Sequence, residues 1–99
     1  MALVMDPAGD EIKALKKVVQ WQGSDLLEVG CGDGRLTLRL ARFGPAAIIG
    51  IDPGAKSIRT ARRNLPKRLA DKIHYAVGQA ERIKYSSGRF DLVVFSWVL

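Results

Sequence analysis

Glycine alternates along a short segment that begins with an acid: Gly30, Gly32 and Gly34 follow Glu28 at every second position. The segment comes directly after an apolar run and directly before a stretch with helical spacing. Glycine permits the backbone angles of a tight turn and leaves no side chain between the backbone and a ligand. An acid beside such a turn suits a ligand that carries an ammonium group and no pyrophosphate. The segment therefore predicts a turn against which a bound molecule lies.

This spacing differs from the two common phosphate-binding motifs. Dinucleotide-binding turns read G-x-G-x-x-G and aim a helix start at a pyrophosphate. Here the third glycine comes one residue early, and Arg35 occupies the position that the pattern would need. The Walker pattern is also absent, because no Gly-Lys-Ser/Thr follows. A nucleotide-binding domain of another class, such as a dehydrogenase, stays open as an alternative.

Together with a second acid, the segment resembles the opening of class I S-adenosylmethionine-dependent methyltransferases. Glu28-x-Gly30-x-Gly32-x-Gly34 is similar to the first motif of that family, and Asp52 ends the next apolar segment as the family's second acid does. The resemblance covers about residues 10–99. It implies S-adenosylmethionine as cofactor and S-adenosylhomocysteine as product. It also implies that Asp52 holds the two ribose hydroxyls, each oxygen accepting one hydroxyl hydrogen, at roughly 1.5–3 kcal/mol per bond.

The resemblance assigns further cofactor contacts along the chain. Pro53 resembles the residue that lies against the adenine, and the loop containing Gln79 and Ala80 resembles the loop at the adenine edge. The family usually has Asp where this chain has Gln79, so the contact with the adenine amino group is weakened or rearranged, while the Ala80 N–H can still reach an adenine nitrogen. Ser96 lies in the last segment, which flanks the reactive methyl group. Cys31 is placed among the cofactor contacts as a small buried residue of the turn, since no base is evident to make it a nucleophile.

Hydropathy patterns supply the elements that position these residues. Apolar strands alternate with amphipathic helices, which indicates an α/β Rossmann-like fold with a parallel sheet between two helical layers. We expect strand order 3-2-1-4, with the ligand at the switch point between the first and fourth strands. The predicted helices are 10–20, 35–43 and 55–65, and the predicted strands are 26–29, 46–51, 73–77 and 90–98.

The resemblance covers only part of the family's domain, which adds a fifth strand, more helices and an antiparallel pair. We therefore expect residues 1–99 to be a single, partial domain, truncated after the fourth strand. The segment 90–99 would then be an unpaired apolar edge, which favours pairing between chains. This predicts a homo-oligomer that buries residues 90–99.

Composition limits the class of protein. The chain has 99 residues, of which 47% are hydrophobic and 26% charged, as in ordinary globular domains. No apolar run approaches the roughly 20 residues that span a bilayer, and the N-terminus lacks the pattern of a signal peptide. We expect no membrane partner. One cysteine allows no internal disulfide, which fits the cytoplasm.

The net charge of +6 has one obvious source, a run of cations between residues 56 and 72 in which Asp71 is the one acid. A nucleic-acid surface is one interpretation. We favour a solvated helix face, because no aromatic residues interleave the charges to stack bases. The cations are Lys56, Arg59, Arg62, Arg63, Lys67, Arg68 and Lys72.

Other polar residues receive simpler interpretations. Asp33 either caps the following helix or contacts the ligand, and both readings stay open. His74 is expected to be a half-exposed structural residue, and Glu81 a solvated one. Trp97 is a core aromatic, a pocket wall or an exposed residue. No group of His, Cys and carboxylates has metal-ligand spacing, so we expect no metal.

The hypothesis for function is methyl transfer by direct displacement, in which an acceptor oxygen, nitrogen or carbon attacks the sulfonium methyl in line. Such chemistry depends mainly on positioning, and no catalytic residue is assigned. The segment Ser96–Leu99 does not match the Asn/Asp-Pro-Pro-aromatic motif of nucleic-acid amino methylases, which favours a small-molecule acceptor. An RNA methyltransferase that uses the basic surface, and a cofactor-binding fragment without activity, are the alternatives.

Overall fold

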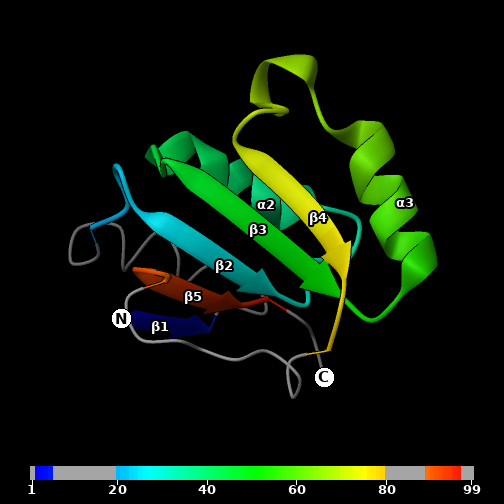
Figure 1. The fold of residues 1–99 in the computed structure, drawn as a ribbon, viewed down its shortest axis with the longest axis horizontal. Helices are drawn as coiled ribbons and strands as arrows, with labels where there is room; N and C mark the ends of the chain where they lie inside the picture. The colour runs from blue at the N-terminus through cyan, green and yellow to red at the C-terminus, as the bar shows by residue number, and fades with distance from the viewer. Residues whose placement is uncertain (1, 6–19, 80–88, 97–99) are drawn as a thin grey trace.

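Five parallel strands form one sheet, in the order β1-β5-β2-β3-β4 (Figure 1). The computed structural model describes the backbone of residues 2–5 and the whole of residues 20–79 and 89–96. The expected order 3-2-1-4 is confirmed, as β4-β3-β2-β5. The elements are β1 (Ala2–Met5), β2 (Asp25–Val29), α2 (Arg35–Leu40), η1 (Ala41–Phe43), β3 (Ala47–Asp52), α3 (Ala55–Asn64), η2 (Lys67–Leu69), β4 (Ile73–Val77) and β5 (Leu92–Phe95).

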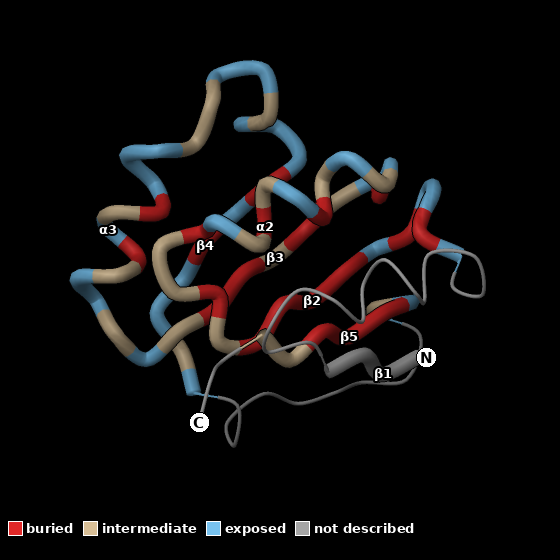
Figure 2. Tube along the Cα trace, turned by 180° about the vertical axis from the view of Figure 1, so that it is seen from behind, coloured by how far each residue is buried: buried red, intermediate tan, exposed pale blue. Residues whose placement is uncertain are grey.

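The two faces of the sheet carry separate apolar clusters, because successive side chains of a strand point to opposite faces. Figure 2 shows the buried positions running along β2, β3 and β5, with α2 in front of β3 and α3 beside β4. The cluster under these helices includes Leu26, Ile48 and Ile58, while Leu27 and Val93 belong to the cluster on the other face. The helix predicted at 10–20 lies outside the described residues.

Glycine turns connect strands to helices at the carboxyl edge of the sheet. Gly34, with φ 89°, precedes α2, and Gly54 precedes α3. The predicted helix 35–43 is observed as α2 followed by the 3₁₀ turn η1, which ends at Gly44 with φ 84°. No helix within residues 20–79 and 89–96 is long and apolar enough to cross a membrane.

The expectation that the fourth predicted strand is an unpaired edge is wrong. β5 pairs with β2 on one side and with β1 on the other, in a register that runs from Ala2 opposite Leu92 to Met5 opposite Phe95. The backbone groups of β5 are therefore bonded on both sides. This removes the reason for expecting an oligomer through residues 90–99, of which residues 97–99 lie outside the described part.

Candidate functional site at the carboxyl edge of the sheet

The glycine turn between β2 and α2 has a backbone that requires glycine. Gly30, Gly32 and Gly34 have φ of 82°, 56° and 89°, a region that costs other residues roughly 1–2 kcal/mol each. The turn is tied to the neighbouring strand, because the N–H groups of Gly30 and Cys31 both donate to the Ile51 carbonyl, at 2.8 and 3.0 Å. The predicted tight turn is thus held at the end of β3.

Two of these glycines face different surroundings. A Cβ on Gly34 would lie 2.6 Å from the hydroxyl oxygen of Tyr75 and 3.3 Å from the Cβ of Ala61, so this glycine packs against β4 and α3. A Cβ on Gly32 would meet none of the described atoms within 4 Å. A side chain at Gly32 would therefore meet no described neighbour, so the space beside this residue is open among the described residues.

Asp52 ends β3 and joins two turns through its carboxylate. Its Oδ2 accepts a hydrogen bond from the Gly32 N–H at 3.0 Å, and its Oδ1 accepts one from the Gly54 N–H at 2.8 Å. The residue is half-buried. Each carboxylate oxygen has a second lone pair, so both can still accept a hydrogen bond from a ligand. The structure thus brings Asp52 to the glycine turn, the segment that the resemblance pairs with it.

Glu28 lies beneath the turn and is 0% exposed. The Thr37 hydroxyl, in the first turn of α2, donates to Glu28 Oε1, and the Ser96 hydroxyl donates to Oε2 at 2.7 Å. Burial raises the pKa of Glu28, the hydroxyls of Thr37 and Ser96 oppose this, and the nearby charge of Asp52 adds a smaller increase. The role of Glu28 toward a ligand's ammonium group stays a prediction.

Ser96 follows β5 and meets the glycine turn from the other side. Its N–H donates to the Val29 carbonyl at 3.0 Å, and its hydroxyl oxygen lies 2.9 Å from the Gly30 carbonyl oxygen. The ends of β2 and β5 are thus joined at the switch point where the sequence placed the ligand. Ser96 is half-buried and is among the predicted residues that the structure brings together.

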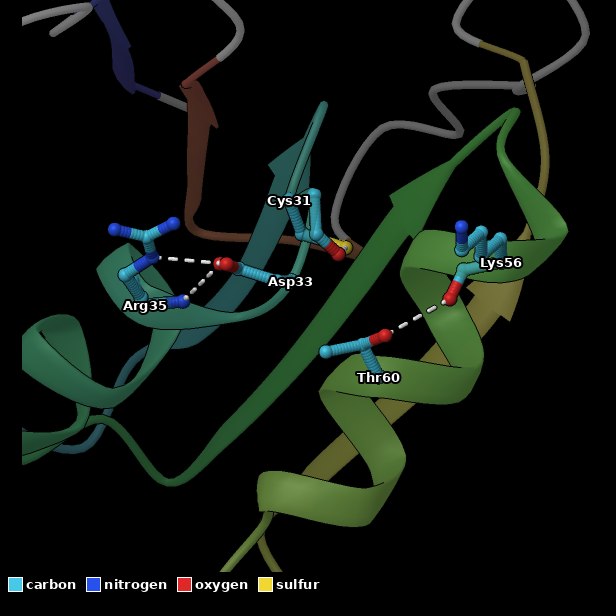
Figure 3. A network of polar contacts seen from close by, with 6 residues as sticks. Cys31, Asp33, Arg35, Lys56 and Thr60 are labelled. Atoms are coloured by element: carbon cyan, nitrogen blue, oxygen red, sulfur yellow. Dashed lines mark hydrogen bonds and ion pairs between the residues drawn. The ribbon is translucent and has the colours of Figure 1, made fainter.

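Cys31 is buried in the same turn (Figure 3). Burial, with smaller effects from the charges of Glu28 and Asp52, raises the pKa of its thiol to about 12. Because the thiolate is the nucleophile, the structure agrees with the view of Cys31 as a small packed residue.

Asp33 bonds to the start of α2. It accepts hydrogen bonds from the Arg35 N–H at 3.2 Å and from Arg35 Nε at 2.8 Å, and Figure 3 shows these two residues turned toward each other. The bonds from Arg35 lower the pKa of Asp33. The N-cap of α2 is Gly34, which makes no side-chain cap bond, so the contacts of Asp33 are with the first residue of the helix, and both interpretations stay open.

The predicted adenine contacts are only partly described. Pro53 and Gln79 are exposed, and the Gly78 N–H donates to the Asp52 carbonyl at 3.0 Å, which keeps this loop beside the end of β3. Ala80 lies outside the described residues, as do Glu81 and Trp97. Val77 is 55% exposed and pairs in register with Asp52, so the same edge offers an apolar surface.

Some features lie away from the site. His74 is exposed on β4, and within residues 20–79 and 89–96 no three His, Cys, Asp or Glu residues are grouped to hold a metal. A cavity of about 130 Å³ lies at the amino ends of β2 and β3, where Asp25 and Ala47 begin these strands. It is therefore at the opposite edge of the sheet from the glycine turn.

Two residues of the site were not singled out in the sequence. Thr37 is a polar residue on the inward face of α2, one turn before the buried Leu40. Tyr75 alternates with Ile73 on β4 and is buried; burial raises the pKa of its hydroxyl, and a hydrogen bond with the Thr37 side chain opposes this. Thr37 could have been found in the sequence, because it is a polar residue on the apolar face of the predicted helix 35–43. No pattern in the sequence pointed to Tyr75.

Comparison with known proteins connects this geometry to a family. A family model described as "Methyltransferase domain" matches residues 26–99. The human mitochondrial ubiquinone biosynthesis O-methyltransferase is 41% identical over 80 residues, which are 78% of this chain and 21% of that protein. The 7SK snRNA methylphosphate capping enzyme of Mus musculus is 31% identical over 78 residues, covering 77% of this chain and 12% of that enzyme.

A solved structure supports the same architecture. The S-adenosylmethionine dependent methyltransferase from Mesorhizobium loti superimposes with a TM-score of 0.72 at 22% identity, over 89% of this chain and 39% of that one. At this identity the likeness shows the fold. The chain spans between 12% and 46% of the length of the curated relatives considered.

Proposed function

The chain belongs to the methyltransferase domain family, and from this premise we propose that residues 1–99 are a single, partial domain that binds S-adenosylmethionine at the glycine turn. We propose further that the whole protein transfers the methyl group to a small-molecule acceptor. Each relative considered is more than twice as long as the part that this chain matches, so the activity and the acceptor rest on inference. A cytoplasmic location is likewise part of the proposal.

The observation that carries the proposal is the placement of Asp52. Its carboxylate accepts from the Gly32 N–H on one oxygen and from the Gly54 N–H on the other, so it is held fixed at the carboxyl edge. One lone pair on each oxygen stays available for a pair of hydroxyls. The space beside Gly32 is open among the described residues. These features suit a ribose beside the turn, which supports a nucleoside-containing cofactor.

The part of the reaction that these residues perform is binding and orientation. S-adenosylmethionine, when bound, would supply an electrophilic methyl group on its sulfonium for transfer to the acceptor, with S-adenosylhomocysteine as the product. Asp52 would fix the ribose, and the backbone of Gly30 and Gly32 would let the ligand approach closely. Ser96 would hold the end of β5 against that turn. Positioning of this kind accounts for most of what such a displacement needs.

Calorimetric titration with S-adenosylhomocysteine tests the cofactor proposal. We expect the native chain to bind, Asp52→Ala to lose at least tenfold in affinity, and Asp71→Ala to bind as the native chain does. Asp71 is the matched control, because it is an exposed acid beyond η2. NAD should bind more weakly than S-adenosylhomocysteine. Tighter binding of NAD, or equal binding by Asp52→Ala and the native chain, would instead support another class of nucleotide-binding domain.

One observation favours RNA as a second candidate acceptor. The cations of α3, η2 and the following turn are exposed, with Asp71 as the single acid between residues 56 and 72. Cations near a phosphate backbone release counterions on binding, which makes the affinity fall steeply with salt. The double substitution Arg59→Glu with Arg63→Glu should then abolish salt-dependent binding of an RNA oligonucleotide, measured by fluorescence anisotropy. The control Arg42→Glu, on η1, should not. If the native chain, the double variant and Arg42→Glu all bind the oligonucleotide equally, RNA is removed as a candidate acceptor.

A further inference from the structure

Three elements converge on the buried carboxylate of Glu28. Thr37 comes from the first turn of α2, Ser96 from the end of β5, and Glu28 itself from β2. Thr37 and Glu28 are each 0% exposed. One hydroxyl donates to each carboxylate oxygen, so the described contacts give both oxygens a donor of their own.

We propose that Thr37 is a positioning residue for the cofactor site: with Ser96 it holds Glu28 in a buried clasp that fixes the glycine turn against the end of β5. The inference rests on the proposed function, because it concerns how that same site is held. The clasp is defined as Thr37, Glu28 and Ser96. It assigns Glu28 a place beneath the ligand and gives Thr37 a role that acts through another residue.

The clasp fixes the backbone of the glycine turn, because Glu28 and Thr37 lie on either side of that turn in the sequence. Glu28 precedes Gly30 by two residues and Thr37 follows Gly34 by three, so the carboxylate–hydroxyl bond closes the chain around the turn. Ser96 adds a contact from a distant part of the chain, with its N–H on the Val29 carbonyl. The turn is therefore held both across its own ends and against β5.

The chemistry of the clasp depends on the hydroxyl rather than on the shape of Thr37. A buried carboxyl oxygen that loses its hydrogen-bond partner keeps the full cost of leaving water. Thr37→Val preserves the volume and removes the donor. Thr37→Ser keeps the donor and removes a methyl group. A role in packing alone predicts the opposite ranking of these two variants.

The chain offers a matched control in α3. The Thr60 hydroxyl donates to the Lys56 carbonyl within the helix, at 3.2 Å, as Figure 3 shows. Thr60→Val is thus the same chemical change in a helix that follows the next strand. It should leave S-adenosylhomocysteine binding unchanged.

The experiment compares the full native chain with Thr37→Val, Thr37→Ser and Thr60→Val. We expect Thr37→Val to weaken S-adenosylhomocysteine binding by about tenfold or more, which corresponds to about 1.4 kcal/mol, and Thr37→Ser to restore affinity to within about threefold of native. The second readout needs no ligand. The Thr37 bond lowers the pKa of Glu28, so carboxyl NMR should show a higher pKa in Thr37→Val and no change in Thr60→Val.

The outcomes separate this inference from the proposed function. Native-like binding by Thr37→Val, or Thr37→Ser as weak as Thr37→Val, overturns the clasp. If the native chain binds no S-adenosylhomocysteine, the proposed function fails, and the NMR titration alone decides: an unchanged Glu28 pKa in Thr37→Val overturns the clasp. If Thr37→Val does not fold, Ser96→Ala removes the other donor from a half-buried position, and native-like binding by that variant overturns the clasp equally.

Discussion

Gly34→Ala should be among the most damaging single-methyl substitutions in this chain. Gly34 has φ 89°, and a Cβ there would lie 2.6 Å from the Tyr75 hydroxyl oxygen, 3.1 Å from Tyr75 Cζ and 3.3 Å from the Ala61 Cβ. The Tyr75 ring is buried on β4, so it cannot move away into solvent. The new methyl group therefore meets both a backbone penalty and an overlap.

The magnitude follows from these two costs. A left-handed backbone costs a residue other than glycine about 1–2 kcal/mol, and overpacking in a core typically costs about 1–3 kcal/mol. Together they predict a loss of about 2–5 kcal/mol in the free energy of unfolding. A natural domain has only about 5–15 kcal/mol in total, so the variant should be close to the limit of folding.

Gly23→Ala measures the cost of the left-handed backbone alone, without a steric overlap. Gly23 has φ 75°, and no described atom lies within 4 Å of a Cβ built there, so the loss should be about 1–2 kcal/mol. Adding Tyr75→Phe to Gly34→Ala should recover about 1 kcal/mol, because it removes the atom closest to the new methyl group. Urea denaturation measures all three variants. Equal losses for Gly34→Ala and Gly23→Ala would refute the reasoning.

Two further predictions concern ionisation in the same turn. With a thiol pKa of about 12, Cys31 should react with iodoacetamide at pH 8 about a thousandfold more slowly in the native chain than in urea; a difference of less than tenfold would contradict this. Burial raises the pKa of Glu28, so the Glu28 carboxyl group binds its proton more tightly in the native state than in the unfolded state. The free energy of unfolding should therefore fall as pH rises from the ordinary carboxyl range through the raised pKa, and Glu28→Gln should remove that part of the fall. Urea denaturation across pH checks it, and an identical slope in both proteins would disprove it.

The arrangement of the sheet was predictable from local patterns. Apolar segments separated by amphipathic helices indicate parallel strands, and the preference for right-handed crossovers leaves few orders for them. The glycines of the turn were predictable as well, because Gly30, Gly32 and Gly34 all adopt the backbone that their spacing indicated. Asp52 reached the turn because β3 pairs beside β2, with Glu28 opposite Gly50.

What the sequence could not supply are contacts between distant segments. β1 was not predicted, since four apolar residues (Ala2–Met5) have no periodicity to indicate a partner, and their pairing with β5 is a tertiary event. The burial of Glu28 was missed for the same reason. Thr37 and Ser96 reach it only after α2 has packed on the sheet and β5 has paired in register, with Val94 opposite Glu28. An acid beside glycines therefore pointed to the right edge of the sheet, but gave no sign of the hydroxyls that bind it.

The position of Glu28 is costly for folding alone, and this cost bears on function. Its hydroxyl partners do not fully offset the burial, since the pKa is still raised, and the charge of Asp52 increases it further. An uncharged residue of similar size would fit the core under α2 at less cost. Departures from local rules of this kind are expected at functional sites. A cationic ligand above the turn would lie near both Glu28 and Asp52 and would offset their repulsion. The burial of Glu28, which is costly in the ligand-free fold, would then favour binding of a cofactor that carries a sulfonium and an ammonium group.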